Sequence, residues 1–183
     1  MGNPKKARKK YSTPSHPWQK FRIDDEKALI REYGLKNKKE IWKISSKVKG
    51  FSRQAKNLIA RTNPQGEKER NQLIMRLNRL GLLSKEANLD DVLGLKTRDL
   101  MDRRLQAMVL KKGLARSMRQ ARQFIVHQHI MVSGKKITAP NYLVKMGEEN
   151  EITFAPISQL SDPDHPEREI KDAMPKKKKV DKK

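Results

Sequence analysis

The sequence contains no cysteine, few aromatic residues and no long apolar run. The absence of cysteine excludes disulfide scaffolds, thiol catalysis and cysteine-ligated zinc, and it fits a reducing compartment. Aromatic residues make up only 5% of the chain. Leucine, isoleucine, valine and phenylalanine together reach about 22%, just above the level at which a highly charged chain is expected to be disordered. These values predict a folded protein with a thin core, in one domain or two small ones.

No segment has the apolar length of a membrane span or a secretory signal. The longest apolar clusters, residues 80–83 and 124–126, fall far short of the roughly 18 to 20 residues that a membrane-spanning helix requires. The basic residues at the start of the sequence lead into Tyr11, Pro14 and Pro17 without an apolar stretch. We therefore expect a cytoplasmic protein without a membrane partner.

Basic residues outnumber acidic ones by two to one. There are 43 lysines and arginines against 21 aspartates and glutamates, which gives a formal net charge of +22 and a pI near 10.3. Such a charge opposes compaction unless a polyanion neutralises it. The expected partner is therefore nucleic acid.

The first two thirds of the chain have the pattern of helices. Residues 1–22 contain seven basic residues and no acidic one, with Pro4, Pro14 and Pro17 as helix breakers, and predict an extended basic arm. Asp24 is the expected N-cap of the first helix, Gly50 the expected end of the second, and Ser52 the start of the third. The apolar spacing predicts helices over about residues 27–33, 38–49, 52–59, 67–80, 90–95, 97–113 and 117–128.

After residue 130 the pattern changes to the alternation of strands. Short strands are predicted over residues 130–132, 135–137, 142–144 and 152–154, with a turn at Ser133–Gly134 between the first two. The sequence therefore predicts an α+β protein in which a helical bundle precedes a small curled antiparallel sheet. Residues 148–172 then carry a net charge of −6, and the lysine-rich residues 175–183 are expected to be disordered.

The strongest functional signal is the stretch from Arg103 to Gly147, which has ten basic residues and no acidic one. In the helix after Ser117, a step of about 100° per residue places the basic and polar residues opposite the apolar ones. Met118, Ala121 and Ile125 share one side, and Arg116, Arg119 and Gln123 share the other. A solvated basic face would give the same pattern, but ten like charges without a counter-charge favour phosphate binding.

The same stretch resembles a known RNA-binding module. The matching residues are Arg103, Arg104, Leu105, Val109, Gly113, Ala115, Ser117, Ala121, Arg122, Gln123, Ile125, His127, Ile130, Val132 and Gly134. In order and spacing they resemble the module named after the S-four ribosomal protein family. Residues 33–40 and 89–93 resemble the helical half of that family in its archaeal and eukaryotic form. Ser133 and His129 depart from the residues common in the module, which leaves local contacts of the turn open.

The resemblance implies a protein of the small ribosomal subunit without catalytic activity. It implies direct binding to ribosomal RNA at a junction of several helices, nucleation of assembly, and support of translational accuracy. It also implies a place near the messenger entry site beside the universal small-subunit protein five, without an obligate homo-oligomer and without a cofactor. The expected organisation is an arm over residues 1–22, a helical domain over 23–102, an S-four-type module of two helices on the sheet over 103–165, and a disordered tail over 166–183.

The expected RNA contacts combine the basic stretch with the arm and the second helix. They are Lys5, Lys6, Arg8, Lys9, Lys10, Lys47, Lys49, Arg53, Arg103, Arg104, Lys111, Lys112, Arg116, Ser117, Arg119, Arg122, Gln123, His127, Lys135 and Lys136. Trp18 and Tyr11 are the aromatic residues best placed to stack on bases, whereas Tyr33, Trp42, Phe51 and Phe124 are expected in the core.

Other functions find less support in the residues. His127 and His129 are two positions apart and do not share a helical face, so no metal site is expected. Asp24–Asp25 and Asp90–Asp91 stand at predicted helix starts, where capping explains them, and there is no glycine-rich phosphate loop. The alternatives are a DNA-compacting protein, which the charge alone permits, and an RNA-modification factor, for which residues 1–100 lack a catalytic constellation.

Overall fold

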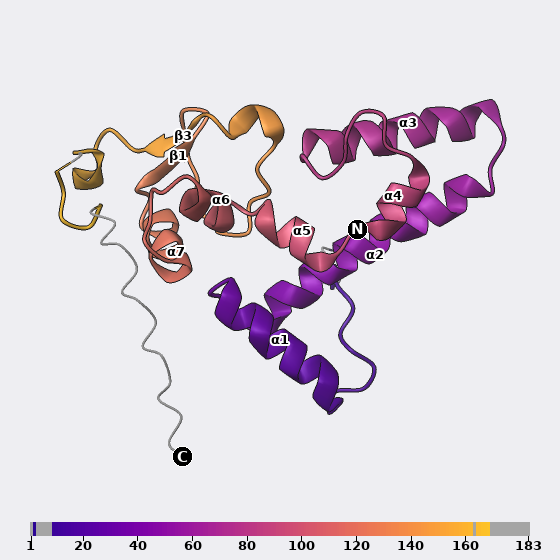
Figure 1. The fold of residues 1–183 in the computed structure, drawn as a ribbon, viewed down its shortest axis with the longest axis horizontal. Helices are drawn as coiled ribbons and strands as arrows, with labels where there is room; N and C mark the ends of the chain where they lie inside the picture. Colours follow the sequence, from indigo (N-terminus) through magenta and orange to yellow (C-terminus); the bar gives the residue numbers. More distant parts are fainter. Residues whose placement is uncertain (1, 3–8, 163, 169–183) are drawn as a thin grey trace, which may run out of the picture.

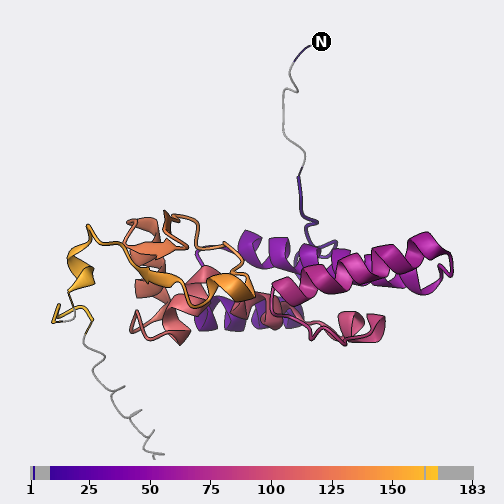
Figure 2. The ribbon, with the colours of Figure 1, turned by 90° about the horizontal axis from the view of Figure 1, so that it is seen from above.

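The computed structural model describes residue 2 and residues 9–162 and 164–168. The elements follow one long axis, with the long helices toward one end and a small sheet toward the other (Figures 1 and 2). Lys5, Lys6 and Arg8 of the arm, and the lysine-rich residues 175–183, lie outside the described residues. None of the helices in the described part of the chain has the length and apolar character needed to cross a bilayer.

The helical half is built around one long helix, α2. Its helices are α1 (Lys20–Glu32), α2 (Lys38–Ile59), α3 (Pro64–Arg79), α4 (Leu89–Gly94) and α5 (Thr97–Asp102). Helix α2 packs against each of the other four. Its buried stripe supplies Ile44, Val48, Phe51, Ala55 and Leu58 to the core. The spacing of these residues keeps one face of α2 apolar along most of its length.

Helix α2 is continuous through Gly50, so the prediction of two separate helices was wrong. A glycine inside a helix costs about 1 kcal/mol relative to alanine. The apolar stripe continues with the same period on both sides of Gly50, from Val48 to Phe51, and its burial outweighs that cost. Ser52 does not begin a helix, because it lies within α2 and its hydroxyl donates to the Val48 carbonyl at 3.2 Å.

Helix α1 begins earlier than predicted. It starts at Lys20, so residues 20–22 are helical rather than part of the extended arm. Asp24 lies inside this helix and pairs with Lys27 at 3.2 Å instead of serving as the N-cap. The first turn is tied to the preceding segment, since Arg22 donates to the Pro17 carbonyl at 2.7 Å, and Arg22 also pairs with the buried Glu26 one turn later in α1.

The second half places two helices and a three-stranded sheet around a separate core. It contains α6 (Leu105–Lys111), α7 (Met118–Val126), β1 (Ile130–Val132), β2 (Lys135–Lys136) and β3 (Ile152–Phe154), with 3₁₀ turns η1 (Met146–Glu148) and η2 (Gln159–Ser161). The sheet is antiparallel in the order β2-β1-β3. The predicted α+β class, with helices first and a small antiparallel sheet after them, is confirmed.

The helix predicted over residues 97–113 is broken at Arg103 and Arg104. Arg104 adopts an extended conformation and forms a β-bridge with Leu143. The Leu105 amide donates to the Tyr142 carbonyl at 2.8 Å, and the Val144 amide donates to the Arg103 carbonyl at 3.0 Å. Residues 142–144 therefore form this bridge and not the strand that was predicted. Their hydrogen bonds to residues 103 and 105 replace those that a continuous helix would make there.

The hydrophobic core divides into two clusters between Met101 and Leu105. Gln106, which is buried, ties the two together, because its side-chain amide donates to the Tyr33 carbonyl at 3.1 Å and to the Met118 carbonyl at 2.7 Å. Beside it, Gly34 has a φ of +55°, and a Cβ at this position would lie 3.0 Å from the Met118 Cβ. Glycine is therefore required both by the backbone conformation and by the close approach of α7.

A buried ion cluster of Glu40, Arg104 and Arg122 also joins the two halves. Glu40 lies in the first turn of α2, Arg104 just before α6, and Arg122 on α7. The Glu40 carboxylate accepts from Arg104 at 2.6 Å and from Arg122 at 2.8 Å. Arg104, only 1% exposed, also donates to Asn141. Although burial alone would raise the pKa of Glu40, the hydrogen bonds from Arg122 and Arg104 lower it below its ordinary value of 4.5.

We predict that Glu40→Gln destabilises the protein by about 3–5 kcal/mol, because it leaves the buried Arg104 guanidinium without a counter-charge. The free energy of unfolding in urea measures the effect. The matched control is Glu69→Gln, which removes an exposed pair with Arg61 and should cost less than about 1 kcal/mol. Equal effects of the two substitutions would show that the cluster does not hold the halves together.

We also predict that the cluster makes stability depend on pH in the acid range. A carboxylate whose pKa is lowered by folding contributes its full stabilisation above its unfolded pKa, and loses it as the pH falls through the folded value. The contribution of Glu40 should therefore be constant above its ordinary pKa of 4.5 and decline at lower pH. Unfolding free energies measured from pH 6 downward should fall more steeply for the wild type than for Glu40→Gln. Parallel curves for the two proteins would contradict this.

Candidate nucleic-acid interface

Helix α7 presents a polar face to solvent and an apolar face to the core, as predicted. Ala121 and Ile125 are buried and Met118 is half-buried, whereas Arg119 and Gln123 are exposed. The apolar face is anchored by the second core cluster, which includes Phe124. The exposed side chains are therefore held on a rigid element and point away from the protein.

The first turn of α7 is capped by Ser117 and has the Glu167 carboxylate beside it, 2.9 Å from the side-chain nitrogen of Gln120. The Ser117 hydroxyl accepts a hydrogen bond from the backbone amide of Gln120 at 3.2 Å, which confirms Ser117 as the predicted cap. Gln120 in turn accepts from the Arg116 amide at 2.7 Å through its side-chain oxygen. The positive end of the helix dipole and the exposed Arg116 together favour an anion at this turn.

The β1–β2 hairpin adds two further cations. Ser133 and Gly134 have φ angles of +49° and +72°, as a two-residue type I′ turn requires. Strand β2 then places Lys135 opposite Val132 and Lys136 opposite Met131. Both lysines are exposed, so the hairpin carries its positive charge outward.

The expectation that the basic stretch has no counter-charges was wrong, because acidic residues from other elements reach it. Arg104 and Arg122 pair with Glu40, and Arg103 pairs with Glu149 while donating to the Val144 carbonyl at 3.0 Å. The side chains of Arg103 and Arg104 are 14% and 2% exposed. These three arginines are bound by carboxylates within the fold, so they are not among the proposed RNA contacts.

Three other cations of the stretch have an acidic neighbour but remain exposed. Lys111 lies 3.5 Å from Asp102, and Arg116 lies 3.4 Å from Glu167. Lys145 pairs with Glu148 at 3.1 Å. Exposed pairs of this kind contribute little to stability, so their cations can exchange partners at small cost.

The remaining four cations of the stretch have no acidic partner among the residues that the structure describes. They are Lys112, Arg119, Lys135 and Lys136. Arg119 lies on α7, the two later lysines on the hairpin, and Lys112 at the end of α6. We refer to these four residues, together with Arg116 and Gln123, as the α7–hairpin face. His127, also exposed, follows directly after α7.

The other predicted contacts lie on the arm and on α2. Lys9 and Lys10 are exposed, and the Lys9 ammonium lies 5.6 Å from the centre of the Tyr11 ring. Lys47, Lys49 and Arg53 are exposed on α2. Figure 1 shows that α2 runs away from α7 into the helical half. A second group of cations, Arg76 and Arg79 on α3, was missed because only the fold brings them opposite Lys47.

The aromatic residues divide as the sequence suggested. Tyr33, Phe51 and Phe124 are buried, and the half-buried Trp42 donates from its indole nitrogen to Glu26 at 2.9 Å. Trp18, in contrast, is 91% exposed just before α1. A ring this exposed is free to stack on a base or to contact a protein neighbour.

The two neighbouring histidines do not form part of a metal site in the described residues, where no group of three potential ligands occurs. His129 instead shares a hydrogen bond of 2.8 Å with the Ser158 hydroxyl. Its pKa is lowered below the ordinary value of 6.5 by partial burial and by the neighbouring His127. A neutral His129 therefore packs beside Phe124 near neutral pH.

Comparison with known proteins identifies the family. Residues 103–150 match the S4 domain, which corresponds to the S-four-type module expected from the sequence. The small ribosomal subunit protein uS4 of Methanococcus aeolicus is 53% identical over 176 residues, which cover 94% of this chain and 99% of that protein. The chain belongs to the uS4 family.

Other members of the uS4 family are similar along nearly the same length. The protein of Methanothermobacter thermautotrophicus is 49% identical over 160 residues, covering 87% of this chain and 94% of the relative. That of Nanoarchaeum equitans is 47% identical over 167 residues, covering 90% and 93%. The similarity to uS4 therefore includes the helical half as well as the S4 domain.

We predict that Arg116→Glu combined with Arg119→Glu abolishes specific binding to structured small-subunit RNA without unfolding the protein. Both side chains are exposed, so the change reverses charge without opening a cavity. Filter binding gives the affinity, and circular dichroism with thermal melting reports on the fold.

The control for this variant reverses two exposed charges away from the α7–hairpin face, at Arg31 and Lys85. It should weaken binding only modestly through the loss of net charge. An unchanged affinity of the Arg116 and Arg119 variant, with the fold intact, would mean that RNA contacts a different surface.

Proposed function

We propose that this chain is a structural constituent of the small ribosomal subunit and binds small-subunit ribosomal RNA directly. The observation that carries the proposal is the α7–hairpin face, where four cations lack an acidic partner in the described residues and lie on rigid elements. Unpaired cations on a folded surface bind phosphate by releasing counterions, while neutral side chains such as Gln123 can add polar contacts. Family membership supports the same conclusion.

The arrangement favours a binding role over catalysis. The pairs Asp24–Asp25 and Asp90–Asp91 do not meet in a cleft, since Asp24 lies within α1 and Asp91 accepts from the Asn88 amide at 2.8 Å as part of a helix cap. Binding to structured RNA is also favoured over DNA compaction, because Arg119, Lys135 and Lys136 are fixed on the helix and hairpin of a folded module that matches the S4 domain.

Finer parts of the function rest on the family resemblance. We propose that the RNA site is a junction of several helices, that binding nucleates assembly, and that the protein supports translational accuracy near the messenger entry site. The proposed neighbours are other small-subunit proteins, including the universal protein five, together with messenger RNA, in a cytoplasmic ribosome. Trp18 and the exposed acidic residues that follow β3 are surfaces available for such protein neighbours.

We predict that affinity for structured small-subunit RNA falls steeply with salt. Each neutralised phosphate releases roughly 0.7–0.9 counterion, so four contacts should weaken binding on the order of 100-fold between about 50 and 200 mM salt. Fluorescence anisotropy with a labelled RNA fragment measures the slope, and duplex DNA of equal length is the competitor. A flat salt dependence, or equal competition by duplex DNA, would overturn the proposal.

A further inference from the structure

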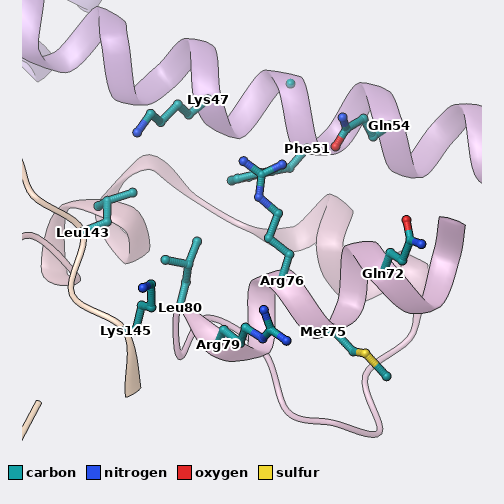
Figure 3. Close-up of a pocket in the computed structure, with 11 residues that line it drawn as sticks. Lys47, Phe51, Gln54, Gln72, Met75, Arg76, Arg79, Leu80, Leu143 and Lys145 are labelled. Atoms are coloured by element: carbon teal, nitrogen blue, oxygen red, sulfur yellow. The ribbon is translucent and has the colours of Figure 1, made fainter. Parts of the chain in front are cut away.

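A second basic surface lies between the two halves, in a groove of about 710 Å³. Its walls are α2, α3 and the segment over residues 143–145 that leads into η1, as Figure 3 shows. The volume falls within the roughly 300–1,000 Å³ of pockets that hold small organic molecules. In Figure 1, α3 lies at the upper right of the molecule and α7 at the left.

The groove is lined by four cations and by no carboxylate. Lys47 comes from α2, Arg76 and Arg79 from α3, and Lys145 from the segment before η1. In Figure 3 these side chains surround the opening from three elements. Only Lys145 has an acidic partner in the described residues, the outlying Glu148 at 3.1 Å. Such a ring of positive charge favours an anionic occupant.

The floor of the groove is apolar, and a cation lies over its aromatic ring. Phe51 is buried, and the Arg76 guanidinium carbon lies 5.7 Å from the centre of its ring. Leu80, Leu143 and the exposed Met75 complete the apolar lining. A planar guanidinium held over an aromatic ring offers its outer face to another flat group, and a nucleobase is such a group.

The backbone of α2 is left open where it borders the groove. Gly50 lines it, and a Cβ added at this position would have no heavy atom within 4 Å. Neither the backbone conformation nor packing within the described protein requires glycine here. Glycine inside a helix disfavours the helix, and it is commonly retained where a ligand approaches the backbone closely.

We propose that this groove receives one unpaired nucleotide of a single-stranded RNA segment. The base lies on the outer face of Arg76 and over Gly50, and the flanking phosphates lie against Lys47, Arg79 and Lys145. An acidic peptide would satisfy the four cations, but it would not use the flat guanidinium over Phe51 or the open backbone at Gly50. The proposal rests on the RNA-binding function proposed above and extends it to a second contact, which is lined by none of the residues of the α7–hairpin face.

Because α2 and α3 belong to the helical half and residues 143–145 to the second half, a nucleotide in the groove contacts both. Binding there would therefore hold the two halves in the relative position that Glu40, Arg104 and Gln106 already set. The groove thus adds an RNA contact that depends on the assembled protein and not on the S4 domain alone.

Filling the groove from Gly50 tests the proposal. The probe is a fluorescent single-stranded oligouridine of about eight nucleotides, within the usual site sizes of single-strand binders. Gly50→Leu should weaken its binding by about tenfold, the range expected for loss of one stacked base. The matched control is Gly94→Leu, since a Cβ added at Gly94 would also meet open space but Gly94 does not line the groove. That control should change affinity by less than about twofold.

Arg76→Lys supplies a second variant that retains the charge. It should also weaken oligouridine binding, because an ammonium lacks the planar face that stacks on a base. Its control is Arg31→Lys, an exposed arginine outside the groove. Photo-cross-linking of a thiouridine-substituted probe should label groove residues such as Met75, and Gly50→Leu should remove that label.

Several outcomes would overturn the proposal. The first is unchanged oligouridine binding for both Gly50→Leu and Arg76→Lys. The second is that cross-links are confined to the α7–hairpin face. The third is that a glutamate-rich peptide binds the wild-type protein and loses affinity for the Arg76→Lys variant as the RNA does. Structured ribosomal RNA measured in parallel separates this result from the proposed function. If only the groove proposal is wrong, structured ribosomal RNA still binds the wild-type protein. If the proposed function is wrong, structured ribosomal RNA does not bind the wild-type protein either.

Discussion

The buried Glu40 carboxylate is the point on which the arrangement of this protein depends. It stands in the first turn of α2, and two arginines from the other half of the chain converge on it at 2.6 and 2.8 Å. A buried charge is costly unless it is paired and hydrogen-bonded, so this contact tolerates few alternative positions of α2 and α7. The orientation of α7, and with it the direction of the α7–hairpin face, follows from that constraint.

The excess of positive charge is therefore divided between two uses. Arg103, Arg104 and Arg122 are bound by carboxylates and hold segments together, whereas Arg119, Lys135 and Lys136 have no such partner in the described residues. Arginine suits the first use because its planar fork satisfies two acceptors at once, as Arg122 does with the two carboxylate oxygens of Glu40 at 3.3 and 2.8 Å. A chain with a net charge of +22 can fold in this way and still present cations to an anionic partner.

Local patterns predicted the local structure well. The two faces of α7, the Ser117 cap, the Ser133–Gly134 turn and the strands at 130–132 and 152–154 all depend on residues near one another in sequence. The family resemblance was likewise carried by spacing within short segments, and the comparisons confirmed it.

The predictions that failed depended on distant contacts. Gly50 does not end a helix because Val48 before it and Phe51 after it are both buried. The helix is broken before Leu105 because Arg104 pairs with Leu143. The absence of acidic residues between Arg103 and Gly147 suggested unpaired arginines. Arg104 nevertheless pairs with Glu40, which lies more than sixty positions away in sequence. The groove beside Gly50 could not be predicted for the same reason, since three separate segments form it.

The central claim is that ribosomal RNA lies on the α7–hairpin face, and the absence of native cysteine allows a direct measurement. A single cysteine at the exposed Gln123 would carry a tethered iron chelate that cleaves nearby RNA in a complex with small-subunit ribosomal RNA. A cysteine at Asn150, exposed among Glu148, Glu149 and Glu151, provides the comparison. We expect strong, localised cleavage from position 123 and weak cleavage from position 150. Equal cleavage from both positions, or stronger cleavage from Asn150, would contradict it.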